Sequence, residues 1–516
     1  MFAKTIVRTN AYYDSITLMS LTSQVSEMAG VQDIMVGMGT DLNKESLARL
    51  DLLTEEANAS SPNDLLIGVC VIDEETLDAV LEETDSILAA KKGPSKSNVS
   101  EDEQPRSIEK ACQLSPGYNM AVISVPGVYA AREARQALRQ GMHVFLFSDN
   151  VSVEDEILLK KTASAEDRLM MGPDCGTSII NGVPLGFANR VRRGSIGIVG
   201  ASGTGIQQVS TLIDCLGEGI SQAIGTGGRD LSDKVGGLTT LTALELLTAD
   251  DSTKIIVLIS KPPAQAVVGK IIAKAKLINK PVVICFLGNK TPLESVSNNI
   301  TICNNLEEAA IQAVGLASGS NNITLPDEDA CGFIKTANSQ LKDSQRYVRA
   351  LFGGGTLCEE SMMVFRNLGI SYFSNVPSVK TEALADVEES KENTFLDMGE
   401  DHFTRGRPHP MLEPSLRVPR LLKEAADPEV AVILFDVILG HGSHSDPAGV
   451  MAAAVKQAKE AAAKDGRQLS FVASLVGTQA DPQNFDQQKR ILEQEGVFVC
   501  VSNYRAANLT ANLLKK

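Results

Sequence analysis

Residues 194–205 read GSIGIVGASGTG, a short apolar run that ends in a glycine-rich turn. The apolar run predicts a buried strand, and the residues that follow, to about Cys215, predict a helix. A glycine-rich turn between a strand and a helix is typical of α/β domains, in which right-handed helical crossovers join parallel strands. We therefore expect an α/β fold around an open parallel sheet.

The same order of elements returns farther along the chain. Residues 347–358 read YVRALFGGGTLC, again a strand, a run of glycines and the start of a helix. Each copy then continues with two more predicted strands separated by a helix, at 220–228 and 253–263 in the first and at 394–402 and 430–440 in the second. This repeated order predicts an internal duplication of an open Rossmann-like or flavodoxin-like domain.

The remaining segments complete the predicted domain organisation. At roughly 150 residues per domain, a chain of 516 residues suggests about three or four domains. We predict an N-terminal α+β module at 1–92, a Pro-, Ser- and charge-rich linker at 93–118, a Rossmann segment at 119–192, and the two copies at 193–320 and 346–516.

Composition excludes several classes of protein. The chain has 48 Lys and Arg against 64 Asp and Glu, a formal charge of −16, and no basic cluster of the kind that binds nucleic acid. No apolar window reaches the ~18 residues that a membrane span needs, and no secretory signal is evident. The nine cysteines are scattered, which is typical of a reducing compartment. We expect a cytoplasmic protein that binds neither nucleic acid nor membrane.

The two glycine-rich turns are the strongest candidates for a binding site. A helix N-terminus that follows a glycine-rich turn presents free N–H groups and positive potential, which favours a phosphate or a carboxylate. Neither turn has the Walker pattern, so no ATP site is expected. The alternative is that both are only tight turns. The predicted phosphate-binding residues are Ser202, Gly203, Thr204, Gly205, Gly354, Gly355 and Thr356.

Two cations near the first copy are further candidates. Arg229 follows the glycine-rich stretch GTGG at 225–228 and is predicted to contact the phosphate. The alternative is an Arg–Asp pair that closes the turn. Lys261 precedes two prolines at the end of a strand, where its ammonium group is placed to neutralise a phosphate. A solvated surface lysine is the alternative.

The histidine-containing loop 440–446, GHGSHSD, occupies the position in the second copy that Lys261 has in the first. His441, His444 and Asp446 form a weak metal pattern because no distant ligand can be named, so we expect no metal and assign His441 to an anionic substrate. The basic stretch 402–409 also suggests an anionic substrate, or a salt-bridged surface loop.

The motifs GPDCG, GIVGASGT and GTGG, within residues 119–290, resemble those of the α subunit of succinyl-CoA synthetase. Residues 346–505, with FLDMG, look like the carboxyl-terminal ligase domain of its β subunit. The fused arrangement, with ISKPP and FGGGTLC, is similar to the FdrA family of acyl-CoA synthetase-like proteins. The resemblance implies that Pro173, Asp174 and Cys175 belong to a CoA-binding segment, so CoA is a candidate cofactor. A structural role is the alternative for Cys175.

The sequence also departs from the synthetase pattern. The synthetases carry the phosphoryl group on a histidine, whereas residues 288–305 contain none, and Lys261 replaces a glutamate. No ATP-grasp domain is recognised. The resemblance therefore implies chemistry on an acyl or carbamoyl phosphate, as in the carbamoyl transfer between oxalurate and oxamate of purine-ring catabolism to which FdrA-type proteins are linked. Lys261 and His441 are the predicted catalytic residues, with no general base assigned.

The expected partners are a small anionic metabolite and other protein subunits, further copies of the chain, or both. Two alternatives stay open. One is an acyl-CoA synthetase of the succinate–CoA ligase type that uses CoA. The other is a non-catalytic subunit that binds a metabolite and serves as a scaffold.

Overall fold

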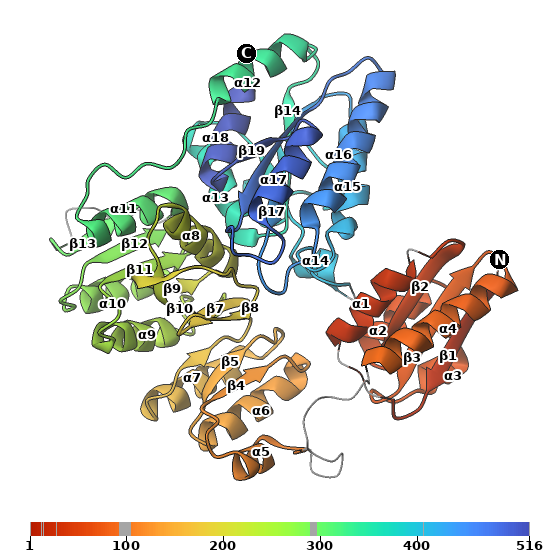
Figure 1. The fold of residues 1–516 in the computed structure, drawn as a ribbon, viewed down its shortest axis with the longest axis horizontal. Helices are drawn as coiled ribbons and strands as arrows, with labels where there is room; N and C mark the ends of the chain where they lie inside the picture. Colours follow the sequence, from red (N-terminus) through yellow and green to blue (C-terminus); the bar gives the residue numbers. More distant parts are fainter. Residues whose placement is uncertain are drawn as a thin grey trace. The chain divides into compact units, whose positions relative to one another are not determined.

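The structure is a computed structural model, and it describes residues 2–514 apart from 12, 14, 27, 92–104, 289–296 and 406 (Figure 1). The chain forms two compact units. Residues 1–104 and 400–409 make up the first, and residues 105–399 and 410–516 make up the second. None of the helices in the described ranges is both long and apolar enough to cross a membrane.

The first unit is an α+β module around a three-stranded antiparallel sheet of order β1-β3-β2. The central strand is apolar on both faces, and helices therefore cover the sheet on both sides. The predicted α+β module is confirmed, whereas α2 and α3 were not predicted. Its elements are β1 (Phe2–Arg8), α1 (Ser15–Ser26), β2 (Val31–Met38), α2 (Asp41–Arg49), α3 (Glu55–Ala59), β3 (Leu65–Val71) and α4 (Glu74–Lys91), with α14 (Asp401–Thr404) from the later segment.

The second unit begins with a small parallel sheet of order β4-β5-β6. Of the predicted linker, residues 92–104 lie outside the described residues, and a short helix occupies its later part. The elements are α5 (Ile108–Leu114), β4 (Met120–Ile123), α6 (Gly127–Arg139), β5 (His143–Leu146), α7 (Val153–Ala165) and β6 (Met170–Met171).

The first copy forms a seven-stranded sheet of order β13-β12-β11-β9-β10-β7-β8, in which the pairs β10–β7 and β7–β8 are antiparallel and the other neighbouring pairs are parallel. Helix α12 (Ala330–Gln340) follows it. The elements are β7 (Thr177–Ile180), β8 (Val183–Gly186), β9 (Arg193–Ala201), α8 (Gly203–Cys215), β10 (Ile220–Gly225), α9 (Leu238–Ala249), β11 (Ile255–Ser260), α10 (Gln265–Ala275), β12 (Val282–Phe286), β13 (Ile300–Ile302) and α11 (Leu306–Ser318).

The second copy forms a six-stranded parallel sheet of order β15-β16-β14-β17-β18-β19. Two 3₁₀ helices, at Lys380–Glu382 and Pro414–Arg417, lie in its long connections. The elements are β14 (Tyr347–Phe352), α13 (Gly355–Asn367), β15 (Phe373–Ser374), β16 (Thr394–Asp397), α15 (Val418–Ala426), β17 (Val430–Ile438), α16 (Pro447–Lys464), β18 (Ser470–Val476), α17 (Phe485–Gln494), β19 (Phe498–Cys500) and α18 (Asn503–Leu513).

The predicted duplication is confirmed by strand order. Strands β13-β12-β11-β9-β10 of the first copy correspond one by one to β19-β18-β17-β14-β16 of the second. In both copies the glycine-rich turn follows the first of these strands along the chain, β9 or β14. The next of them, β10 or β16, lies on one side of this strand, and the one after it, β11 or β17, lies on its other side, so the strand order reverses here. That place is where open α/β sheets bind ligands, outside the carboxyl ends of their strands.

The β7–β8 hairpin was not expected from the sequence. Its turn is Asn181-Gly182, with φ of 52° and 81°. Asn-Gly is the preferred pair for such a turn because both residues tolerate positive φ, so the signal was present in the sequence. The hairpin joins residues 177–186 to the sheet of the first copy.

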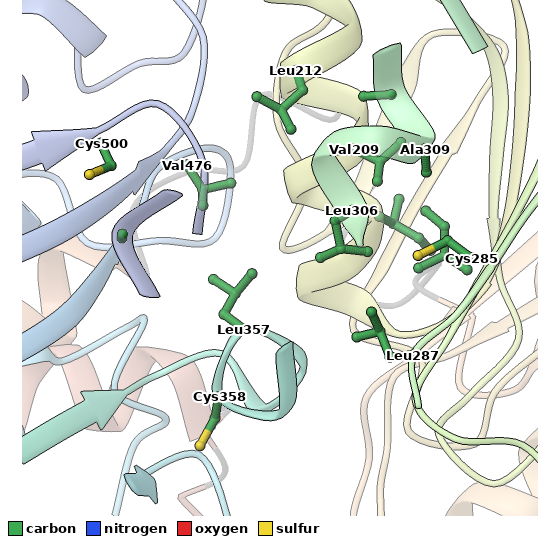
Figure 2. Packing of buried hydrophobic residues seen from close by; sticks show 14 of the residues in the cluster. Val209, Leu212, Cys285, Leu287, Leu306, Ala309, Leu357, Cys358, Val476 and Cys500 are labelled. Carbon is green, nitrogen blue, oxygen red and sulfur yellow. The ribbon is translucent and has the colours of Figure 1, made fainter. Parts of the chain in front are cut away.

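The two copies share one hydrophobic core (Figure 2). Val209 and Leu212 of α8 belong to the same buried cluster as Leu357 of α13 and Val476 of β18. Helices α8 and α13, which begin at the two glycine-rich turns, contact each other. The copies therefore pack as parts of one unit, with the two turns on the same side of their contact.

Candidate functional site

The two glycine-rich turns meet at the N-termini of α8 and α13. The hydroxyl oxygens of Ser202 and Thr356 are 2.7 Å apart and form a buried hydrogen bond between the copies. A Cβ on Gly354 would lie 3.0 Å from the Cγ2 of Thr204, so glycine permits this close approach. The structure thus brings together, from positions about 150 residues apart, the predicted phosphate-binding residues of both copies.

The backbone amides of the two turns divide into two groups. The N–H of Gly205 donates to the Oγ of Ser202 at 3.0 Å, and those of Gly353 and Gly354 donate to the carboxylate of Asp436 at 2.8 and 2.7 Å. The amides of Gly203, Thr204, Gly355 and Thr356 belong to the first turns of their helices and have no acceptor within those helices. These four amides give the junction its positive potential.

Asp436 is a site residue that the sequence analysis missed. It is fully buried on β17, and the guanidinium of Arg417 lies 3.0 Å from its Oδ1. Arg417 also donates to the backbone oxygens of Asp436 and Leu351. The ion pair holds the second turn in place and offsets the carboxylate charge. A single acid inside the apolar run VAVILFDVI was the signal for it.

Lys261 follows β11 and reaches the start of α13. A Cβ on Gly355 would lie 2.8 Å from its Nζ and would collide with the Oδ2 of Asp397. The ammonium group therefore lies beside the second turn although its strand belongs to the first copy. Asp397, which is 3% exposed at the end of β16, was not predicted either.

The predicted CoA-binding residues form a tight loop after β6. The Gly172–Pro173 peptide is cis, and the N–H of Asp174 donates to the backbone oxygen of Ser148 at 2.9 Å. Burial raises the pKa of the Cys175 thiol to about 12, and the weaker hydrogen bonds that the thiol makes with the hydroxyl of Ser178 and the backbone oxygen of Thr177 oppose this effect. Cys175 is thus protonated at neutral pH and lacks the properties of a nucleophile.

Arg229 lies away from the two turns' hydrogen-bond network. Its guanidinium donates to the backbone oxygen of Val151 at 2.7 Å and lies 3.0 Å from the carboxylate of Glu156. The alternative of an Arg229–Asp230 ion pair is wrong. Arg229 pairs with Glu156, and Asp230 pairs with the buried Lys160 at 2.7 Å. These contacts tie the loop after β10 to α7.

His441 is exposed, and its backbone forms an isolated β-bridge with Ala188. The side chains of His444 and Asp446 form hydrogen bonds within their own loop and at the start of α16. The Nδ1 of His444 accepts the N–H of Asp446, and Asp446 caps α16. Within the described ranges, no three His, Cys, Asp or Glu side chains gather as metal ligands do. The basic stretch 402–409 belongs to the first unit, whereas the two turns belong to the second.

Family models match the duplicated part of the chain. A model described as CoA-ligase matches residues 351–513, and one described as CoA binding domain matches residues 191–288. The second match lies on the first copy, C-terminal to the predicted cofactor-binding residues 173–175. These matches show that the two copies are similar to a CoA-ligase domain and to a CoA-binding domain.

Similarity to one relative extends over the whole chain. The chain is 43% identical over 521 residues to the uncharacterized protein YahF of Escherichia coli strain K12. The aligned region covers 100% of this chain and 99% of YahF. The chain therefore belongs to the YahF family.

Two more distant similarities accompany this match. Succinate–CoA ligase [ADP-forming] subunit alpha 1 of Archaeoglobus fulgidus is 27% identical over 176 residues, 33% of this chain and 59% of that subunit. Among solved structures, a dinucleotide-forming acetyl-coenzyme A synthetase 1 from Ca. Korarchaeum cryptofilum is 17% identical, with 77% of this chain and 82% of that chain covered and a TM-score of 0.28.

A third family model, described as the AllF heavy metal-associated domain, matches residues 1–105. That stretch of sequence has no histidine and a single cysteine, Cys70, which is only partly buried on β3. Thiolate and imidazole groups are common ligands in heavy-metal sites. Residues 1–105 by themselves therefore do not supply a site of that kind.

Proposed function

We propose that the junction of the two turns binds the phosphate of an acyl or carbamoyl phosphate, and that the chain acts in carbamoyl transfer as part of an acyl-CoA synthetase-like enzyme. The observation that carries this proposal is the 2.7 Å contact between Ser202 and Thr356. It brings two helix N-termini to one point, and each contributes amides that favour an anion.

The amides and the ammonium group at the junction support an anionic ligand. Arg417 already neutralises Asp436, and the Lys261 ammonium lies beside Gly355 together with the carboxylate of Asp397, so the free amides of the two helix N-termini supply the remaining positive potential. Preorganised amides and an ammonium group stabilise the charge that develops on phosphate as a carbonyl–phosphate bond forms or breaks. Lys261 therefore has the role of holding the phosphate oxygens, and no proton transfer is assigned to it.

The proposed reaction exchanges a carbamoyl group between phosphate and an amide nitrogen, such as that of oxamate. In the direction of phosphorolysis, a phosphate oxygen attacks the carbamoyl carbon, the carbon–nitrogen bond breaks, and the leaving nitrogen takes up a proton. This reaction needs neither ATP nor a phosphohistidine. It suits a chain in which residues 288–305 contain no histidine. Within that segment, residues 289–296 lie outside the described residues.

Thermal stabilisation by separate titrations of carbamoyl phosphate, inorganic phosphate and CoA tests the proposal. Binding to the native state adds RT ln(1 + [L]/Kd) to stability, so about millimolar affinity is visible at high ligand concentration. A shift with carbamoyl phosphate but not with CoA supports carbamoyl transfer. No shift with any ligand contradicts the proposal and favours the scaffold alternative.

Lys261→Met sharpens the test. Removing the ammonium group should weaken carbamoyl phosphate binding by about tenfold or more, since a hydrogen bond to a charged group contributes about 1.5–3 kcal/mol. Lys254→Met is the matched control, because Lys254 is exposed at the opposite end of the same strand, β11. Equal affinities in the two variants would exclude Lys261 from the site.

A second candidate function is CoA-dependent acyl transfer of the succinate–CoA ligase type. The match of residues 191–288 to a CoA-binding model is the observation in its favour. A thermal shift with CoA in the same titration would support this candidate over carbamoyl transfer.

A further inference from the structure

The two copies meet through a surface that is largely apolar, as the side chains of Val209, Leu212 and Leu357 illustrate (Figure 2). Hydrophobic attraction is non-directional, so it does not fix how far one helix slides or turns against another. The proposed site nevertheless depends on the N-termini of α8 and α13 meeting within hydrogen-bond distance. Directional contacts between the copies are needed to set that alignment.

Gln207 of α8 makes one such contact. The side chain is 1% exposed, and its Nε2 donates to the Oδ1 of Asn189 at 3.1 Å and to the backbone oxygen of Leu439 at 3.4 Å. Leu439 follows β17 in the second copy. Asn189 reinforces this contact, because its own Nδ2 donates to the same Leu439 oxygen at 2.9 Å and to Asp481 at 2.8 Å.

Gln208, the next residue of α8, reaches the second copy at another point. It is also 1% exposed, and its Oε1 accepts the N–H of Asn503, the first residue of α18, at 3.1 Å. The Nδ2 of Asn503 donates in turn to the backbone oxygen of Leu357 and to Glu360, both on α13, at 2.9 and 2.8 Å. One residue thus links Gln208 to the helix that carries the second turn.

We propose that Gln207 and Gln208 are positioning residues that align the N-terminus of α8 with that of α13. A buried amide group that lacks a partner costs free energy, and at this register the Nε2 of Gln207 and the Oε1 of Gln208 are paired across the copies. The Oε1 of Gln207 and the Nε2 of Gln208 have no hydrogen-bond partner among the described residues, so a shift of register would leave the Gln208 amide wholly unpaired and the Gln207 amide with Asn189 alone. The consequence for ligand binding rests on the proposed function, whereas the alignment itself does not.

A disulfide-trapping experiment measures the alignment without any ligand. In the full-length double variant Ser202→Cys/Thr356→Cys, the two sulfurs replace oxygens that are 2.7 Å apart, close to the geometry of a disulfide. The rate of disulfide formation under mild oxidation is followed by proteolysis and mass spectrometry, because the chain already has nine cysteines.

Gln207→Met and Gln208→Met are added singly to this background, since methionine keeps the unbranched shape of glutamine. Gln345→Met is the matched control. Gln345 is fully buried, and its Nε2 donates to the backbone oxygens of Val430 and Gln468, at 2.9 and 2.7 Å, within the second copy. Its Oε1 also accepts the N–H of Lys342 at 3.2 Å, so the control loses more hydrogen bonds than either α8 variant without changing a contact between the copies.

We expect each of the two α8 variants to form the disulfide about fivefold to tenfold more slowly. A change of this size in the population of the aligned state follows from the loss of the one or two buried hydrogen bonds that each glutamine makes. The control should match the parent rate although its melting temperature falls. Without the added cysteines, affinity for carbamoyl phosphate should weaken by the same factor in the α8 variants alone.

The outcomes separate this inference from the proposed function. Trapping rates that match the parent in both α8 variants, with circular dichroism showing that they are folded, overturn the positioning role. If the trapping rates differ as expected but the parent does not bind carbamoyl phosphate, the positioning role holds and the proposed function fails.

Discussion

The stability of the second unit should depend on the ionisation of Glu360. This carboxyl is 1% exposed on α13, where its Oε1 accepts the N–H of Leu306 and its Oε2 accepts from Asn503. Burial raises its pKa from 4.5 to about 7, and the two hydrogen bonds only partly offset that effect, while the nearby Glu307 adds to it. Between pH 4.5 and about 7 the folded chain therefore holds a proton here that the unfolded chain has already lost.

The sign and size of the effect follow from linkage. A raised pKa in the folded state means that stability is lost as pH rises through this window. The difference between 4.5 and about 7, at 1.36 kcal/mol per pH unit, corresponds to about 3 kcal/mol for a group with no solvent exposure. Glu360→Gln removes the ionisable group, so its stability relative to the parent should improve by up to this amount between pH 5 and pH 8.

Urea unfolding at pH 5, 6, 7 and 8 measures this difference between the parent and Glu360→Gln. The comparison at each pH cancels the contribution of the other titrating groups. Glu460→Gln, on the exposed face of α16, is the matched control and should run parallel to the parent. A Glu360→Gln profile that also runs parallel to the parent from pH 5 to pH 8 would refute the reasoning.

A pair of glycine substitutions and a chemical-labelling experiment give two further tests. Gly355→Ala places a methyl group against Asp397 and Lys261 and should abolish carbamoyl phosphate binding, whereas Gly269→Ala, with open space around it on α10, should melt at or slightly above the parent temperature. Iodoacetamide at pH 8 should alkylate the exposed Cys331 first in the native chain, and Cys215 more slowly, because partial burial and the nearby Asp214 raise the pKa of the Cys215 thiol. Cys175 should stay unmodified, because burial raises the pKa of its thiol to about 12. Mass spectrometry reads the modification, and early labelling of Cys175 would contradict the assignment of a buried loop.

Much of the fold followed from local patterns. Apolar runs such as 194–200 and 430–438 are long enough to predict buried strands, and the glycine-rich turns after β9 and β14 predict where α8 and α13 begin. The order of these elements revealed the duplication, because a repeated order of strands and helices folds to a repeated sheet. The β7–β8 hairpin was missed although its Asn-Gly turn was visible.

The candidate site was only partly predictable. Ser202 and Thr356 were identified from their turns, and Lys261 from its place at a strand end. Asp436 and Arg417 were missed because one lies inside an apolar strand and the other in a 3₁₀ helix, with nothing in the sequence to show that they pair at 3.0 Å. Arg229 was assigned to phosphate from its neighbouring glycines, but only the structure shows its contact with Glu156.

The sequence by itself determined most of the elements, their order and the two glycine-rich helix starts, because strand and helix formation depend on residues close together along the chain. The tertiary structure alone decided that the two turns meet, that Lys261 of one copy lies beside Gly355 of the other, and that Gln207 and Gln208 link the copies. Such contacts depend on how two apolar surfaces pack and on which buried polar groups can pair across them. Those requirements act between residues far apart along the chain, and no local pattern records them.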